Sequence, residues 1–208
     1  MNAASDKPNG IWRLLTWPNR ISLARLLLIA PYVILLEAHH EQGAYRLIAL
    51  GLFILAAASD AVDGYLARHY GMRSKLGGIL DPLADKALVM TSAILLTLPS
   101  TAVEGARLPT WVVVMIVGKD LWVIVGFLLI FLITGQTYVR PGLPGKLTTF
   151  AQAIMVPAIL LSPELNQLAD WRPGYWLARG LWWAVAVFCV LSVLSYTRKG
   201  IAFTTEHE

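Results

Sequence analysis

Several charged residues of this chain stand inside long apolar stretches, where a charge is costly. An ionisable side chain at membrane depth is rare, and it usually marks a functional site. A structural network of ion pairs is the alternative explanation for any one of these residues taken alone. The residues are Arg25, Asp60, Asp63, Asp81, Asp85, Lys86, Lys119 and Asp120.

The first two aspartates of this set are predicted to share one face of a helix. Successive residues of an α-helix are turned by about 100°, which places Asp60, Asp63, Gly64 and Ala67 within an arc of about 100°. Gly64 and Ala67 carry little or no side chain. That face therefore offers two carboxylates and space for a ligand beside them.

A second pair, Asp81 and Asp85, is spaced by one helical turn and is predicted to stack on the next helix. A short link between the two helices would bring the four carboxylates together, and such a cluster does not ionise fully without cations between its members. Hard oxygen ligands suit Mg²⁺, Mn²⁺ or Ca²⁺ rather than zinc or copper. Two such ions could hold a diphosphate and stabilise an in-line displacement at phosphorus.

Pro82 leaves open a simpler role for Asp81. A proline disfavours the helical conformation in the residue before it and is common in the first turn of a helix. Asp81 could therefore be only the N-cap of the second helix. An N-cap role would not explain Asp60, Asp63 and Asp85.

The elements that position these residues are predicted from composition. Hydrophobic residues make up 57% of the 208 residues and charged residues 14%, with a mean hydropathy of +0.61, whereas soluble domains are about 25% charged. A spanning helix needs about 20 apolar residues, and open strands would leave backbone groups unsatisfied in lipid. We predict an all-α integral membrane protein, with residues 1–208 forming one domain of six transmembrane helices. The predicted spans are 21–38, 44–70, 77–98, 109–134, 147–161 and 175–196.

The segment from Ile11 to Arg20 mixes tryptophan and leucine with arginine. This pattern is typical of a short helix lying in the membrane interface, although an ordinary polar lead-in would look the same. Most Lys and Arg outside the spans fall on the side of the N-terminus. Because basic loops stay in the cytoplasm, we expect both termini there.

The net charge of +4 does not point to nucleic acid, because the basic residues are dispersed between apolar segments. A bilayer with anionic lipids is the expected partner. The one cysteine, Cys189, lies inside an apolar run, which excludes an internal disulfide and a Cys/His metal box.

The aspartates belong to a longer motif, which resembles that of the CDP-alcohol phosphatidyltransferase family. The chain reads Asp60-x2-Asp63-Gly64-x2-Ala67-Arg68-x8-Gly77-x3-Asp81-x3-Asp85, which matches the family motif at every position. The resemblance extends from Trp17-Pro18-Asn19 and Arg25 to Gly145-Lys146-Leu147-Thr148-Thr149 and Gln152. It thus covers most of the chain.

The resemblance implies an activity and a role for each matching residue. Family members have six spanning helices, with an active site at the cytoplasmic side, and transfer a phosphatidyl group from CDP-diacylglycerol to an alcohol with release of CMP. Two Mg²⁺ or Mn²⁺ ions and a homodimer in the inner membrane of a bacterium are expected by the same analogy. The implied roles are metal ligation by Asp60, Asp63, Asp81 and Asp85, with Asp85 also the catalytic base, and contacts to the CDP moiety by Gly64, Ala67, Arg68 and Gly77.

The acceptor alcohol is less strongly indicated. Lys119-Asp120 stands mid-span, where phosphatidylglycerophosphate synthases of this family show Arg-Glu and cardiolipin synthases show Arg-Asp. A second lysine typical of the synthases is replaced by Thr148, which weakens the case for a phosphorylated acceptor. Positive charge near the inner face still favours glycerol 3-phosphate first and phosphatidylglycerol as the alternative. The predicted acceptor-binding residues are Arg25, Lys119, Arg140 and Lys146.

Lys119 could instead be a structural charge that pairs with a neighbour such as Asp120. Adjacent residues on a helix point about 100° apart. We therefore expect a direct pair between them to be disfavoured, which supports the acceptor role.

Two other classes of protein also place aspartates in membranes. Intramembrane prenyltransferases bind magnesium diphosphates, but they are longer and carry their aspartates on well-separated helices. A cation channel or transporter could line its site with carboxylates, but it would not require Gly64, Ala67 and Arg68 at these spacings.

Overall fold

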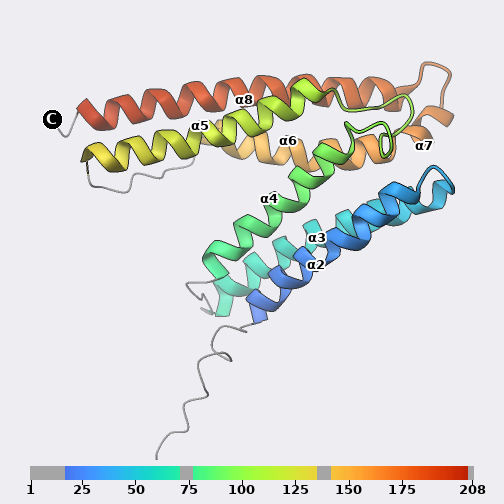
Figure 1. Cartoon of the computed structure of the whole chain (residues 1–208), viewed down its shortest axis with the longest axis horizontal. Helices are drawn as coiled ribbons and strands as arrows, with labels where there is room; N and C mark the ends of the chain where they lie inside the picture. Colours follow the sequence, from blue (N-terminus) through green and yellow to red (C-terminus); the bar gives the residue numbers. More distant parts are fainter. Residues whose placement is uncertain (1–16, 71–76, 135–141, 206–208) are drawn as a thin grey trace, which may run out of the picture. The chain divides into compact units, whose positions relative to one another are not determined.

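The computed structural model describes the backbone of residues 17–70, 77–134 and 142–205, and the side chains of residues 20–59, 83–132 and 142–203. Within these ranges the regular structure is helical, and no strand occurs (Figure 1). The helices are α2 (Trp17–Ala38), α3 (Gly43–Tyr70), α4 (Gly77–Leu95), α5 (Thr110–Thr134), α6 (Leu143–Leu160), α7 (Ser162–Gln167) and α8 (Pro173–Thr205). The chain forms two compact units, Met1–Ser92 and Ala93–Glu208.

In the first unit, α2 packs against α3. Tyr32 and Leu36 of α2 are buried, as are Ala49, Phe53 and Ala56 of α3, so each helix buries residues spaced by three or four positions. The rings of Tyr32 and Phe53 lie 6.2 Å apart between centroids. The alanines let the two backbones approach closely, which is how helices gain packing energy in lipid.

In the second unit, α8 is the central helix and packs against α5, α6 and α7 (Figure 1). Its buried residues recur every three or four positions, which gives one continuous stripe along the helix. α6 contributes a buried face as well. The stripe consists of Ala178, Trp182, Val185, Cys189 and Ser192, and the face of α6 includes Met155, Val156 and Ile159.

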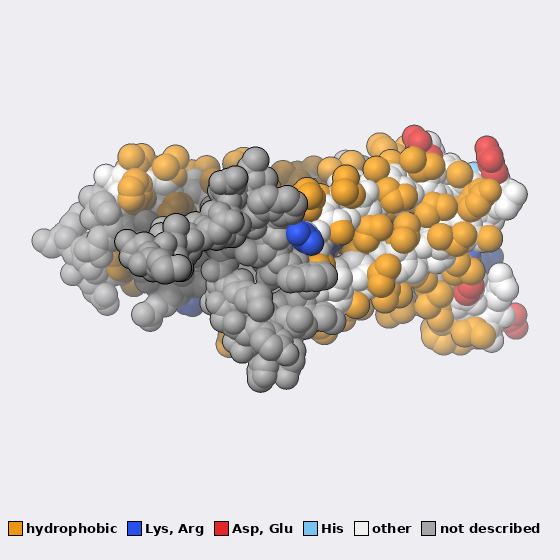
Figure 2. Space-filling model, turned by 90° about the horizontal axis from the view of Figure 1, so that it is seen from below, with side chains coloured by type: hydrophobic (Ala, Val, Ile, Leu, Met, Phe, Trp, Pro, Cys, Tyr) orange, Lys and Arg blue, Asp and Glu red, His pale blue; other side chains and the backbone are white. Residues whose placement is uncertain are grey.

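Within the described residues, four helices are long and apolar enough to cross a membrane. They cover Arg20–Ala38, Thr110–Leu132, Leu143–Leu160 and Pro173–Phe203. Much of their apolar surface is exposed, as expected of helices that face lipid. Figure 2 shows apolar side chains over much of the described surface of one face, with the visible Asp and Glu side chains near one end.

Each predicted span coincides with a helix, and the ends differ. α2 begins by Trp17 rather than at residue 21, so residues 17–20 of the predicted interfacial segment belong to α2, and residues 11–16 lie outside the described part. α4 ends at Leu95, three residues before the predicted end of its span. α8 continues to Thr205, past the predicted end at 196. Arg198 and Lys199 have high helix propensity, so the helix does not stop where the apolar run ends. The short helix α7 was not predicted.

Candidate active site

The four aspartates of the motif lie on two consecutive helices. Asp60 and Asp63 are in the last three turns of α3, and Asp81 and Asp85 are in the first three turns of α4. The side chain of Asp85 is described and is half-buried. The other predicted metal ligands and CDP contacts lie outside the described side chains. They are Asp60, Asp63, Gly64, Ala67, Arg68, Gly77 and Asp81.

The backbone of α4 rules out the N-cap role for Asp81. The helix begins at Gly77, so Asp81 lies one turn inside it. An N-cap residue precedes the first helical residue. Asp81 and Asp85 are therefore both helical and one turn apart.

The two pairs of aspartates lie at similar depths along their helices. With a rise of 1.5 Å per residue, Asp60 and Asp63 lie about 15 and about 10 Å from the end of α3, and Asp81 and Asp85 lie about 6 and about 12 Å from the start of α4. Residues 71–76 join these two helix ends. The two pairs therefore lie within three turns of the link between the two helices.

Asp85 occupies the edge of the packed face of α4. Ala84 and Leu88 on this helix are buried, whereas Leu83 and Lys86 are exposed. The described side chains contain no group of three or more His, Cys, Asp or Glu that could hold a metal ion. Because three of the four predicted ligands lie outside those side chains, the metal site stays a prediction.

Arg25 is a charged residue in the packed interior of the first unit. Its side chain is 1% exposed, in the middle of α2, and Ser22 one turn earlier is equally buried. A guanidinium on the lipid-facing side would meet hydrocarbon, whereas a buried one can be stabilised by other protein groups or by a ligand. The position is consistent with the predicted acceptor role and does not test it.

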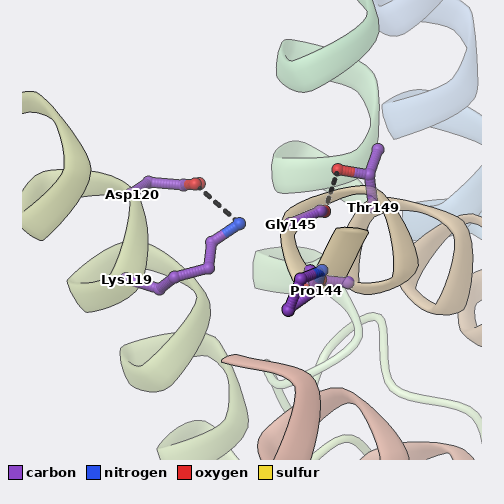
Figure 3. A network of polar contacts seen from close by, with 6 residues as sticks. Lys119, Asp120, Pro144, Gly145 and Thr149 are labelled. Carbon is purple, nitrogen blue, oxygen red and sulfur yellow. Dashed lines mark hydrogen bonds and ion pairs between the residues drawn. The ribbon is translucent and has the colours of Figure 1, made fainter. Parts of the chain in front are cut away.

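Lys119 and Asp120 form an ion pair, contrary to the sequence-based expectation. The Lys119 Nζ lies 2.9 Å from Asp120 Oδ1, with the two side chains 10% and 15% exposed (Figure 3). The turn of about 100° between adjacent residues separates the bonds that leave the backbone, but it does not fix where the ends of long side chains lie. The four-carbon stem of lysine is flexible and reaches round the helix to the neighbouring carboxylate.

The start of α6 is pressed against the last third of α8. A Cβ atom on Gly145 would lie 3.3 Å from the Tyr196 hydroxyl and 3.5 Å from Ser192 Oγ, and one on Gly142 would lie 3.3 Å from Lys199 Nζ. Lys146, a predicted acceptor contact, is exposed at this end of α6, and Arg140 lies outside the described residues.

Sequence reasoning missed the polar residues that α8 brings to this corner. Ser192, Ser195, Tyr196 and Lys199 recur every three or four positions, which was the available signal. The side chain of Ser192 is 1% exposed, and its hydroxyl has no hydrogen-bond partner among the described residues.

This chain is an integral membrane protein, because four of its described helices are long and apolar enough to cross a membrane. Some of these apolar segments also carry charged residues. The family model of CDP-alcohol phosphatidyltransferase matches residues 15–191. The chain belongs to this family and is therefore a phosphatidyltransferase of phospholipid biosynthesis.

Relatives in the family fall into two groups by name. A CDP-diacylglycerol–glycerol-3-phosphate 3-phosphatidyltransferase of Bacillus subtilis is 35% identical over 88% of this chain and 93% of its own length. One of the same name from Aquifex aeolicus is 31% identical over 88% of this chain and 94% of its own length. A CMP-forming cardiolipin synthase of Streptomyces coelicolor is 29% identical over 91% of this chain and 88% of its own length.

Proposed function

We propose that this enzyme transfers the phosphatidyl group of CDP-diacylglycerol to glycerol 3-phosphate and releases CMP. The observation that carries the proposal is the similarity to the Bacillus subtilis enzyme of that name along nearly the whole of both chains. The motif residues are present in full in the sequence, and they lie on the consecutive helices α3 and α4.

Asp60, Asp63, Asp81 and Asp85 would hold two Mg²⁺ or Mn²⁺ ions. Four carboxylates form a hard oxygen donor set, which fits these ions and not zinc or copper. With divalent ions bound, these aspartates would place positive charge at the diphosphate of CDP-diacylglycerol, and that charge would stabilise the leaving CMP. Support comes from the two helices that carry the aspartates, because both place their pair at a comparable depth.

Asp85 would act on the acceptor. A half-buried carboxylate can take the proton of the acceptor hydroxyl as the hydroxyl oxygen attacks the phosphorus on the diacylglycerol side. A new P–O bond forms to the acceptor, and the bond from this phosphorus to the oxygen that bridges the diphosphate breaks. CMP leaves with the bridging oxygen and the electron pair of that bond.

The remaining site residues would bind the two substrates. Gly64, Ala67, Arg68 and Gly77 would contact the CDP moiety, and the lack of bulky side chains at Gly64 and Ala67 would let the nucleotide approach the backbone. Arg25, Lys119, Arg140 and Lys146 would supply positive charge to a phosphorylated acceptor. Arg25 is buried and Lys119 is nearly so, which supports this role, because both cations lie away from solvent, where a charged group needs an anionic partner.

The arrangement in the membrane forms part of the same proposal. We expect six spans, an interfacial segment before the first, an active site at the cytoplasmic side and both termini in the cytoplasm of a bacterium. A homodimer is expected from the resemblance to the family.

Cardiolipin synthesis, with phosphatidylglycerol as the acceptor, is the second candidate. The similarity to the Streptomyces coelicolor cardiolipin synthase over 91% of this chain favours it.

An acceptor screen tests both candidates. Purified protein receives radiolabelled CDP-diacylglycerol, a divalent metal and one of four acceptors: glycerol 3-phosphate, phosphatidylglycerol, inositol phosphate or serine. We expect labelled phosphatidylglycerophosphate and CMP with the first acceptor. Product only with phosphatidylglycerol would select the second candidate, and failure to release CMP with either glycerol 3-phosphate or phosphatidylglycerol would contradict both candidates.

A further inference from the structure

The ion pair of α5 is unusual in its place. Lys119 and Asp120 lie near the middle of a helix that is apolar from Thr110 to Leu132, and both side chains are mostly buried. A charged pair in such surroundings is costly to keep. Its presence therefore calls for a function that an apolar pair could not perform.

The pair sets the direction of the lysine. Because adjacent residues diverge by about 100°, Lys119 must bend along the helix surface to bring its Nζ within 2.9 Å of Asp120. In Figure 3 both charged ends point from α5 towards the first turns of α6, where Gly145 and Thr149 lie. Without Asp120, nothing in the bond geometry of lysine would select this direction.

Polar groups of α8 lie around the same place. On α8, Cys189 and Ser192 are both buried and lie one turn apart. The hydroxyl of Ser192 lies 3.5 Å from a Cβ position on Gly145. Helices α6 and α8 thus bring polar groups together, and Asp120 holds the ammonium of Lys119 towards the start of α6.

We infer that Asp120 is a positioning residue for acceptor recognition, and that it acts by holding the Lys119 ammonium on the α6 side of α5. This inference rests on the proposed function, in which Lys119 contacts the acceptor. An ammonium carries three N–H donors, so a bond to Asp120 leaves donors for the oxygens of an acceptor phosphate. Asp120 itself makes no contact with the acceptor in this scheme.

A double-mutant cycle tests the inference, with the KM of each substrate measured separately. Asp120→Asn should raise the acceptor KM by about tenfold, the size expected when a charged hydrogen bond is lost, and should leave the KM of CDP-diacylglycerol unchanged. Lys119→Met should raise the acceptor KM at least as much. In the Lys119→Met background the Asp120→Asn change should add less than about twofold, because positions that act through each other are not additive.

Two further variants separate positioning from a structural role. Asp120→Glu keeps the carboxylate and should restore most of the acceptor affinity. Trp122→Phe is the matched control, because Trp122 lies on α5 with Lys119 and Asp120. The change removes the hydrogen bond from Trp122 Nε1 to Thr197 Oγ1 of α8 (3.0 Å) without changing a charge. It should leave both KM values unchanged.

The outcomes are distinct. Additive effects of Asp120→Asn and Lys119→Met on the acceptor KM would overturn the inference, and so would equal rises in the two KM values. Should Asp120→Asn alone fail to fold because it leaves Lys119 uncompensated, the comparison of Lys119→Met with the double variant carries the test: an acceptor KM that rises further in the double variant would overturn the inference. If the wild-type enzyme used no phosphorylated acceptor, the proposed function would fail first, before any variant is compared.

Discussion

Gly174, the second residue of α8, lies directly against the backbone of Ser162, the first residue of α7. A Cβ atom on Gly174 would lie 2.8 Å from the Cα of Ser162 and would overlap its carbonyl oxygen. The adjacent Tyr175 N–H donates to Asn166 Oδ1 at 3.0 Å. The corner between α7 and α8 is thus formed by backbone contact, which has no flexible side chain to move aside.

Gly174→Ala should destabilise the protein, because the added methyl group meets the backbone of Ser162. Overpacking typically costs about 1–3 kcal/mol, occasionally more, and we expect the upper end of this range. Gly180→Ala on the same helix is the control, since nothing lies within 4 Å of its Cβ position. Thermal unfolding in detergent should show a lower Tm for Gly174→Ala alone, and equal Tm values for both variants would contradict this contact.

Asp60→Asn, Asp63→Asn and Asp81→Asn should each abolish CMP release and weaken metal binding. Each change removes one anionic oxygen from the proposed donor set while leaving the side-chain shape intact. The variants should still fold, because one charge fewer relieves repulsion among the carboxylates. Near-normal turnover in two of the three at saturating Mg²⁺ or Mn²⁺ would show that no binuclear site is formed by these residues.

Asp85→Asn should behave differently from the other three. As the proposed base, its loss should lower kcat by about 10²–10⁴, while CDP-diacylglycerol still binds. Binding of the CDP-lipid is measured directly, for example by equilibrium titration with the inactive variant. A loss of binding as large as in Asp60→Asn would leave Asp85 only the role of a ligand.

Chelation of divalent metal should stop turnover without unfolding the protein. EDTA treatment is expected to remove activity, and added Mg²⁺ or Mn²⁺ should restore it, because a carboxylate set prefers hard cations. Circular dichroism before and after treatment checks that the helices persist. Full activity after exhaustive chelation would exclude the metal-dependent mechanism.

Lys119→Arg should keep or improve acceptor affinity. A guanidinium binds phosphate through a planar fork, whereas an ammonium is a point charge, and the arginine could still pair with Asp120. The measurement is the acceptor KM with CDP-diacylglycerol saturating, compared with Lys119→Met. An unchanged acceptor KM in Lys119→Met, together with a lower Tm, would identify Lys119 as a structural charge.

The helices and the motif could be predicted from the sequence because both depend on local patterns. Apolar runs of membrane length must form helices to satisfy their backbone groups, and the helices α2 to α6 and α8 follow those runs. Asp60, Asp63, Asp81 and Asp85 lie on consecutive helices, so their spacing already relates them to one another. Membership of the family follows from that spacing, and the family model agrees.

Features that depend on side-chain conformation or on distant contacts needed the tertiary structure. The pair of Lys119 and Asp120 was judged unfavourable from helix geometry, and it forms because a lysine stem bends. Gly174 lies against Ser162, and no periodic pattern in the sequence predicts this contact. The burial of Arg25 depends on which side of α2 packs against a neighbouring helix. Local spacing determines which groups share a helix face, whereas packing alone decides what that face meets.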